Sequence, residues 1–417
     1  MKKLFLFSLC LFLLFSTACG RSEQAALLLQ LDEEMPYLLE YFPEYLLDTH
    51  MQDAILHFTE QLFVKLLETD EKNPSFSPFA SYFSLALASL GAHEDTRLAF
   101  RELLGAEPAA LAVSLHDLQS IWGKSSYNPA RYLAATLCLD DTFPLADDFS
   151  NWVQTYFHSQ PAHFDFADTE LQAYKTNWFS RLFPHLPETA FLSSEFTPNS
   201  ASLLSALPVS FSFDDAISPV SLTQSSFTTT NNEVREIPFL TTSATTLKVL
   251  QNETLHAVSL PFAADNIGFL LIAPATPEIP LRQWIADVSI ADVLHLLSDT
   301  EDVSVTLPAF DVLFSTDFSS ILQSMGLDIA FDPQFANLSG MIAKEDADDI
   351  LHLSAVLQTT HFTLDETGVH SNPPALSDTL ADNTPFADAT LHFHFPFLYL
   401  IYDFYHHIPL IMGVFEG

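Results

Sequence analysis

Apolar residues recur with helical spacing in the first part of the chain. One predicted helix begins near Thr49 and ends at the polar segment Asp70–Pro74, and its apolar face carries Ile55, Phe58, Leu62 and Leu66. A second apolar helix follows Ser75–Pro78 and runs through Gly91. Another helix is closed by the glycine of Glu102–Gly105. This region is therefore predicted to be helical.

The carboxy-terminal half changes its hydrophobic period. Runs of strand length that are rich in β-branched and aromatic residues are Leu255–Pro261, Gly268–Pro274, Asp302–Pro308, Leu351–Glu366 and Leu391–Asp403. Helical patterns separate them at Leu281–Ser298 and Asp317–Met325. This order predicts an α+β domain with large, mostly antiparallel sheets. The segment Ser194–Thr246, rich in Ser, Thr and Asn, fits neither period clearly.

The amino terminus has the pattern of an export signal. Lys2 and Lys3 precede the apolar run Leu4–Phe15, which is too short to span a bilayer. Small residues then lead to Cys19 and resemble a bacterial lipobox, with Ser16 in the place of the usual Leu. We expect a signal peptide at 1–18 and lipidation of Cys19, with simple secretion as the alternative. A tether and acidic segment at 19–50 would precede a single domain at 51–417.

Cysteine usage fits an exported protein without a disulfide framework. Outside the signal and Cys19, the chain contains only Cys138, which lies in the apolar stretch Leu133–Leu139. A disulfide needs two cysteines, so none is expected in the mature domain. Cys138 is predicted to be a small buried hydrophobic residue.

The charge balance excludes some partners. The chain has 53 Asp+Glu against 15 Lys+Arg, a formal net charge of −38, while 48% hydrophobic residues indicate a globular protein. Nucleic acid is excluded as a main partner because little positive charge is available to displace counterions. The charge also repels anionic membranes and favours basic protein partners, so we expect membrane contact only through a lipid anchor. We also expect a monomer.

Motifs for catalysis, nucleotides or metals are lacking. Gly123–Ser125 matches the end of a phosphate loop, but Leu118 occupies the position of its first glycine. His392 and His394 share one face of a predicted strand, whereas a metal site needs three or four converging ligands. We expect no enzyme activity, no metal and no cofactor.

Several motifs, in their order along the chain, resemble the serpin family. They are Asn73–Pro78 with Leu85–Leu87 and Leu90–Ala92, the strand runs at 255–261 and 268–274, Val303–Phe310, Ala336–Gly340, Leu353–Gly368, and Pro396–Asp403 with Pro409–Gly413. The resemblance covers roughly residues 50–417. It implies a serpin fold with three β-sheets, about nine helices and an exposed reactive-centre loop near the carboxy terminus, at about 369–391.

The resemblance also implies a mechanism. Inhibitory serpins offer the loop as bait, and after cleavage the loop inserts as a new strand in the largest sheet and distorts the acylated protease. The protein would therefore be a suicide substrate for an extracytoplasmic serine or cysteine protease, with no catalytic residues of its own.

The loop hinge departs from the inhibitory pattern. After Gly368, inhibitory serpins have Thr or Ser, an acidic residue and then mostly alanines; here the chain continues Val369, His370, Ser371, Asn372, Pro373 and Pro374. A central strand needs each amide for its ladder, and proline has none to give. Gln358 also stands where a His normally supports sheet opening. These departures argue against insertion of the loop and trapping of the protease.

Counting from both ends of the loop gives a candidate scissile region. It contains Leu380, Asp382, Asn383, Thr384 and Pro385. Leu380 would suit a chymotrypsin-like protease and Asp382 an acid-directed one, whereas a solvated loop without a target is the alternative. Two functions therefore follow from the sequence: a serpin-type protease inhibitor, or a non-inhibitory serpin-fold protein that binds a ligand or a basic protein.

Overall fold

The computed structural model describes residues 49–122, 133–166, 170–191, 197–217, 221–264, 266–276, 279–343, 350–372 and 389–417. The predicted signal peptide, Cys19 and nearly all of the tether lie outside these ranges. So do Pro373, Pro374 and the candidate scissile residues Leu380, Asp382, Asn383, Thr384 and Pro385. No helix in the described ranges combines the length and apolar character needed to cross a bilayer.

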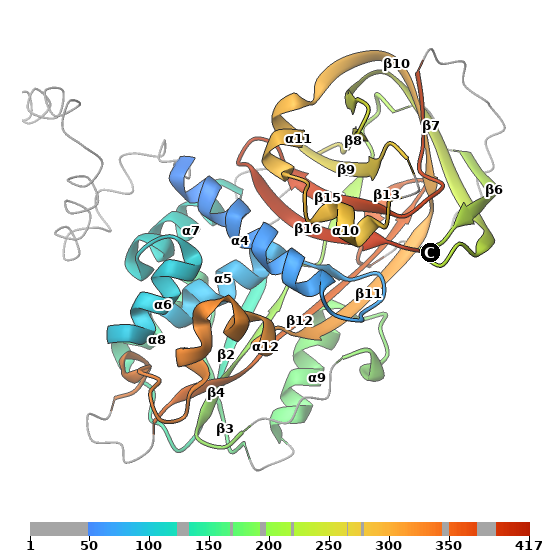
Figure 1. Cartoon of the computed structure of the whole chain (residues 1–417). Coiled ribbons are helices and arrows are strands. Elements are labelled where there is room, and N and C mark those ends of the chain that lie inside the picture. The colour runs from blue at the N-terminus through green and yellow to red at the C-terminus, as the bar shows by residue number, and fades with distance from the viewer. Residues whose placement is uncertain are drawn as a thin grey trace, which may run out of the picture.

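Nine α-helices lie in the described ranges; α4 to α7 come before β2 in sequence, and the other five lie between later strands (Figure 1). Their bounds are α4 Thr49–Leu67, α5 Pro78–Ser89, α6 Glu94–Leu104, α7 Pro108–Trp122, α8 Asp147–Phe157, α9 Glu170–Leu182, α10 Leu281–Ile285, α11 Ile290–Leu296 and α12 Ser319–Leu322. Short 3₁₀ or π turns are η2 Glu188–Ala190, η3 Gln323–Leu327, η4 Asp328–Phe331 and η5 Ser339–Met341.

The strands of the described residues form two sheets. Their bounds are β1 Ser75–Phe76, β2 Ala134–Asp140, β3 Ala162–Phe164, β4 Ser200–Ala206, β5 Ser210–Ser212, β6 Ser221–Thr228, β7 Val234–Gln251, β8 Leu255–Pro261, β9 Ile267–Pro274, β10 Ser298–Pro308, β11 Phe310–Asp317, β12 His352–Asp365, β13 Gly368–His370, β14 Ala389–His392, β15 Phe397–Asp403 and β16 Ile408–Phe415.

One sheet has seven strands in the order β3-β2-β4-β12-β13-β5, and β11 also pairs with β12. The other has nine, in the order β1-β16-β15-β9-β8-β7-β10-β14, with β6 on β7. The family pattern predicted three sheets. Here the 18-residue strand β7 pairs with β6, β10 and β8 along its length, and so joins two of them into one hydrogen-bonded sheet.

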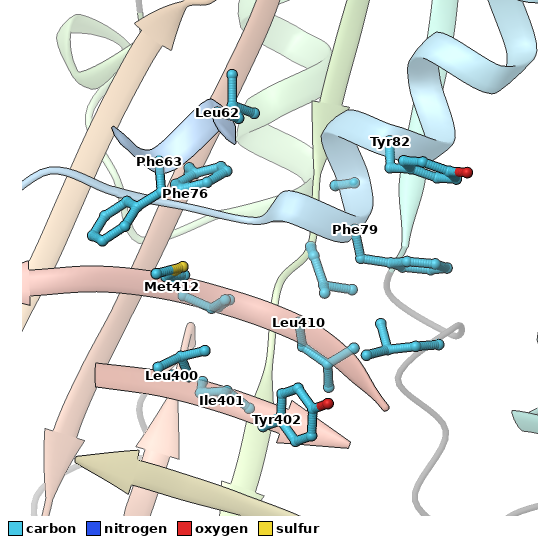
Figure 2. Packing of buried hydrophobic residues seen from close by; sticks show 14 of the residues in the cluster. Leu62, Phe63, Phe76, Phe79, Tyr82, Leu400, Ile401, Tyr402, Leu410 and Met412 are labelled. Carbon is cyan, nitrogen blue, oxygen red and sulfur yellow. The ribbon is translucent and has the colours of Figure 1, made fainter. Parts of the chain in front are cut away.

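The amino-terminal helices pack on the nine-stranded sheet through an aromatic core. Ser77 caps α5 by accepting a hydrogen bond from the Ala80 amide, and Pro78 occupies its first turn. Figure 2 shows side chains of α4, β1 and α5 facing those of β15 and β16, among them Leu62, Phe63, Phe76, Phe79, Tyr82, Leu400, Ile401, Tyr402, Leu410 and Met412. This packing fixes the carboxy-terminal strands under the helices.

The seven-stranded sheet is buried on both faces. Neighbouring residues of β4 belong to different cores: Leu203 joins the main core and Leu204 joins a second one. On β12, Val356 and Leu357 divide in the same way. The second core also contains aromatic residues of α9, such as Phe179, so α9 covers one face while α5 covers the other.

Most predicted elements occur where the hydrophobic pattern indicated. β8 has the predicted bounds, and Gly105 ends α6 in a left-handed conformation with φ 74°. The single predicted run Leu391–Asp403 is divided between two strands. β14 ends at His392, and β15 begins at Phe397, directly after Pro396. Leu281–Ser298 becomes two short helices. Ser194–Thr246 contains strands β4, β5 and β6 and the larger part of β7.

Candidate functional site: the inserted hinge

The described part of the hinge, Gly368–Asn372, begins as a strand inside the seven-stranded sheet. One edge of β12 pairs in parallel with β4 over residues 352–358, and in an antiparallel manner with β13 over residues 363–365. The opposite edge of β13 pairs with β5, with Val369 opposite Phe211. The hinge therefore lies between β5 and β12, above the point where β4 and β12 meet.

The turn that leads into β13 is stabilised by one carboxylate and requires a glycine. Asp365 Oδ1 accepts from the Thr367 amide at 2.7 Å and from the Thr367 hydroxyl at 2.6 Å. Gly368 has φ 141°, and a Cβ at this position would lie 2.0 Å from the Phe211 carbonyl oxygen. A side chain is excluded here by both the backbone conformation and the approach of β5.

Ser371 connects the hinge to both neighbouring strands. Its amide donates to the Val209 carbonyl at 2.7 Å, and its Oγ accepts from the Val209 amide at 2.8 Å. The same hydroxyl donates to the His361 carbonyl of β12. Because Ser371 is only 1% exposed, these bonds are shielded from water. Ser371 thereby holds the hinge in place at the fork, the point beyond the Gln358–Ser205 pair where β12 separates from β4 and the hinge lies between β5 and β12.

His370 is buried within the inserted hinge. Its Nδ1 lies 3.1 Å from Ser210 Oγ and its Nε2 lies 2.9 Å from Thr367 Oγ1. The Thr367 hydroxyl proton is already donated to Asp365, so His370 donates from Nε2 and accepts at Nδ1 from Ser210. Burial lowers the pKa of His370, and Asp365 opposes this shift. At neutral pH the imidazole is a neutral member of the strand.

A second histidine holds the hinge from β12. His361 Nδ1 donates to the Ser371 carbonyl at 2.9 Å, and its Nε2 lies 3.5 Å from Asp311 Oδ1 on β11. Burial alone would raise the pKa of Asp311, but hydrogen bonds from His361 and Thr363 lower it. The carboxylate thus remains ionised and orients the imidazole toward the hinge.

Gln358 closes the sheet directly below the fork. It stands opposite Ser205 in the last pair between β12 and β4. Its Oε1 accepts from the Ser77 amide at 2.7 Å, and its Nε2 donates to the Ser77 carbonyl at 3.0 Å and to Ser81 Oγ at 2.9 Å. Nε2 also donates to Ser205 Oγ of β4 at 3.3 Å, so the amide ties both strands to the start of α5, and these bonds must break before the sheet can open further.

The sequence predicted an exposed loop from about residue 369, but the first hinge residues are inside the sheet. Val369 is 0% exposed and His370 is 5% exposed, whereas Asn372 is exposed and its side-chain amide donates to the Leu182 carbonyl at 3.4 Å. The difference arises because β5 offers a free strand edge opposite β12. Pro373 and Pro374, which follow in sequence, and the candidate scissile residues lie outside the described ranges.

Other candidates occupy structural positions. Cys138 is free, fully buried in β2, and burial raises its pKa to about 12. The His392 and His394 rings do lie side by side, 5.4 Å between centroids, and His394 stacks on Phe239. In the described ranges no three His, Cys, Asp or Glu side chains converge as a metal site.

Sequence reasoning missed the acceptor side of the hinge. Strand β5 (Ser210–Ser212) pairs with the hinge on the side away from β12, and Val209, just before β5, bonds to Ser371. Phe211 and Phe213 stack on Phe262 behind this strand. The alternation Ser210, Phe211, Ser212, Phe213 has the period of two that is typical of a strand. That short signal lies inside the polar segment that could not be assigned.

Comparison with known proteins gives a consistent result. The model of the family described as "Serpin (serine protease inhibitor)" matches residues 53–416. Intracellular coagulation inhibitor 2 of Tachypleus tridentatus is 24% identical over 321 residues, which cover 74% of this chain and 78% of that protein. Human plasma protease C1 inhibitor is 24% identical over 376 residues, covering 87% and 70%.

Solved structures share the fold at lower identity. The thermophilic serpin tengpin in its native state superposes with a TM-score of 0.75 and 18% identity, covering 89% of this chain and 95% of that one. Human thyroxine-binding globulin in complex with thyroxine gives a TM-score of 0.72 and 19% identity, covering 88% and 98%. Since the family match spans nearly all of the described chain, this protein belongs to the serpin family.

Proposed function

We propose that this serpin inhibits an extracytoplasmic serine or cysteine protease as a suicide substrate, with the chain between Asn372 and Ala389 as bait. One observation carries the proposal: β4 and β12 pair directly below the fork, while Gly368–Ser371 has already begun a strand above it. The sheet is thus in the arrangement from which a cleaved loop would extend the new strand downward.

Further insertion requires a defined set of bonds to break. The pairs from Gln358–Ser205 downward must separate, together with the Gln358 contacts to Ser77 and Ser81. Each buried hydrogen bond contributes about 1 kcal/mol, and the new strand would replace those of the ladder. Insertion is then favourable in free energy only if the backbone amides of the entering strand can donate hydrogen bonds to both β4 and β12.

A non-inhibitory, ligand-binding or partner-binding serpin is the second candidate, and the hinge itself favours it. Pro373 and Pro374 follow Asn372 immediately in sequence, so two donors are missing at the next positions that would enter the sheet. Stalled insertion would let the protease hydrolyse its acyl link and escape. The acidic surface would then select a basic partner.

Incubation with proteases tests both candidates. The purified chain would be mixed with trypsin-, chymotrypsin-, elastase-, subtilisin- and papain-like proteases, run on a denaturing gel, and melted before and after loop cleavage. We expect a covalent complex and a large rise in melting temperature. Clean cleavage with neither would contradict inhibition and support the binding function.

Two variants locate the cause of either outcome. Val369→Arg places a charge at a fully buried position, so it should permit cleavage but abolish the complex. Replacing Pro373 and Pro374 together by alanine restores two amide donors. If the wild type is only cleaved and this double variant forms a complex, the prolines are what stalls insertion.

We also propose that the protein is exported and tethered through Cys19. Lys2, Lys3 and the apolar run Leu4–Phe15 support export, and the small residues before Cys19 support lipid modification. Cys19→Ala should remove acyl labelling and release the protein from membranes. Unchanged membrane association in this variant would contradict the lipid anchor.

A further inference from the structure

His370 gives the hinge a titratable group at the point where the strand enters the sheet. The side chain is buried, both ring nitrogens have hydroxyl partners, and the residue pairs with Thr363 on one side and Ser210 on the other. Placing a second proton on the ring would put it on Nδ1, which now accepts from Ser210. The inserted position thus fits the neutral imidazole.

The charged groups around this position do not pair with His370 directly. β5 carries no titratable side chain over Ser210–Ser212. Asp365 lies in the turn of the same hairpin, but its Oδ1 is occupied by Thr367. The surrounding elements also carry other titratable groups: His352 and His361 on β12, Asp311 and Asp317 on β11, Tyr174, Lys175 and Arg181 on α9, and Glu366 in the turn.

We propose that the inserted hinge is an acid-sensitive latch, in which protonation of His370 releases Gly368–Ser371 from between β5 and β12. Release moves the imidazole from a desolvated strand into water, where the charged form is hydrated. The rest of the sheet stays closed through Gln358, so the latch opens without unfolding β4 or β12.

The direction of the pH dependence follows from the histidine. Burial lowers the pKa of His370 in the inserted state relative to the usual value of about 6.5 in a released hinge. The contribution of the neutral ring to insertion is fully present above pH 6.5 and is lost as the pH falls toward the lowered pKa. Acid therefore favours the released hinge.

What the latch would regulate, namely how the loop is presented to a protease, rests on the proposed inhibitory function. Released residues lengthen the loop that is offered to a protease, and they also give up the first step of insertion. Acid would thus regulate how the bait is presented. The latch itself depends only on the fold and can be measured without a protease.

Hydrogen–deuterium exchange of the purified chain tests the latch. Protection of the peptide spanning residues 366–372, corrected for intrinsic exchange, would be measured from pH 7.5 to 5.0. We expect it to fall about tenfold per pH unit below 6.5 until the lowered pKa is reached. Peptides from β4 should remain protected. His370→Gln, which keeps hydrogen bonding without titrating, should show no such fall, and the exposed His185→Gln should behave like the wild type.

Two results would overturn the latch. One is protection in the wild type that does not change with pH; the other is the same loss in His370→Gln. An NMR titration of His370 in the wild-type chain provides an independent measurement: its midpoint should coincide with the pH at which the loss of protection levels off. A midpoint at or above the usual value of about 6.5 would also contradict the proposal. A working latch without any covalent protease complex would leave the latch standing and reject inhibition.

Discussion

Gly368 and Gly326 both have positive φ angles but differ in their surroundings. A Cβ at Gly368 would collide with the Phe211 carbonyl, whereas a Cβ at Gly326, with φ 98°, would meet no atom within 4 Å. A comparison of substitutions at these two glycines therefore distinguishes the cost of the backbone conformation from the cost of the close approach of β5 to the hinge.

Gly368→Ala should lower the melting temperature far more than Gly326→Ala. We expect a cost of about 1 kcal/mol for the φ angle at Gly326 and about 2–3 kcal/mol at Gly368, where the clash is added. Thermal unfolding followed by circular dichroism measures both. Equal losses would mean that β5 does not contact the hinge as closely as the structure has it.

Ser371→Ala tests the bridging hydroxyl. The substitution leaves the Val209 amide without its side-chain acceptor and the His361 carbonyl without this donor in a buried fork. We expect a loss of about 1–3 kcal/mol and faster amide exchange at Val209. Ser324→Ala, at an exposed position, is the matched control and should change stability by less than about 0.5 kcal/mol. A neutral Ser371→Ala would show that the fork is held by the strand ladder alone.

At the scale of elements, Arg282 joins three segments that are distant in sequence. It lies on α10 and donates from Nε to Glu416 Oε1 at 2.8 Å, next to the carboxy-terminal strand β16. A second nitrogen donates to the Thr69 carbonyl, just after α4, at 2.7 Å. The guanidinium thus fastens the end of the first helix to the end of the chain.

Arg282→Met should destabilise the chain by about 2–3 kcal/mol, because Glu416 is buried and would lose its partner. The matched control is Arg235→Met, which removes an exposed ion pair with Glu233 and should cost less than about 1 kcal/mol. Urea unfolding of both variants gives the comparison. Similar losses of unfolding free energy in the two variants would mean that the Arg282–Glu416 pair contributes no more than an exposed ion pair.

The elements also show what a sequence can and cannot predict. Helix α4 follows from local periodicity, because its buried residues recur with helical spacing, and strand β8 follows from a short apolar run that is buried at most of its positions. Gly368–Ser371 has no such pattern. Its strand exists because β5 and β12, separated by about 150 residues, leave a gap between them. Local spacing predicted that His392 and His394 share a face, but only tertiary structure brings Ser371, Val209 and His361 together.

At the scale of the whole molecule, the few cations are distributed unevenly. In the described ranges no Lys or Arg follows Arg282, whereas acidic residues continue to Glu416. Six of the cations described earlier in the chain form ion pairs: Lys65, Arg97, Arg101, Arg235, Lys248 and Arg282. The 53 acidic residues far outnumber the 15 basic ones, so the chain keeps a net charge of −38 even with every cation counted.

Salt should therefore stabilise this protein. Repulsion among exposed carboxylates opposes the compact state, and it is screened once the Debye length falls to about 10 Å near 0.1 M salt. We expect the melting temperature to rise steadily between 0.02 and 0.5 M sodium chloride, with the largest change at the low end. Sucrose at matched osmolality acts by exclusion rather than screening, so it should not reproduce that low-concentration rise. A melting temperature that is constant or falls with salt would mean that repulsion among the carboxylates does not limit the stability of the folded chain.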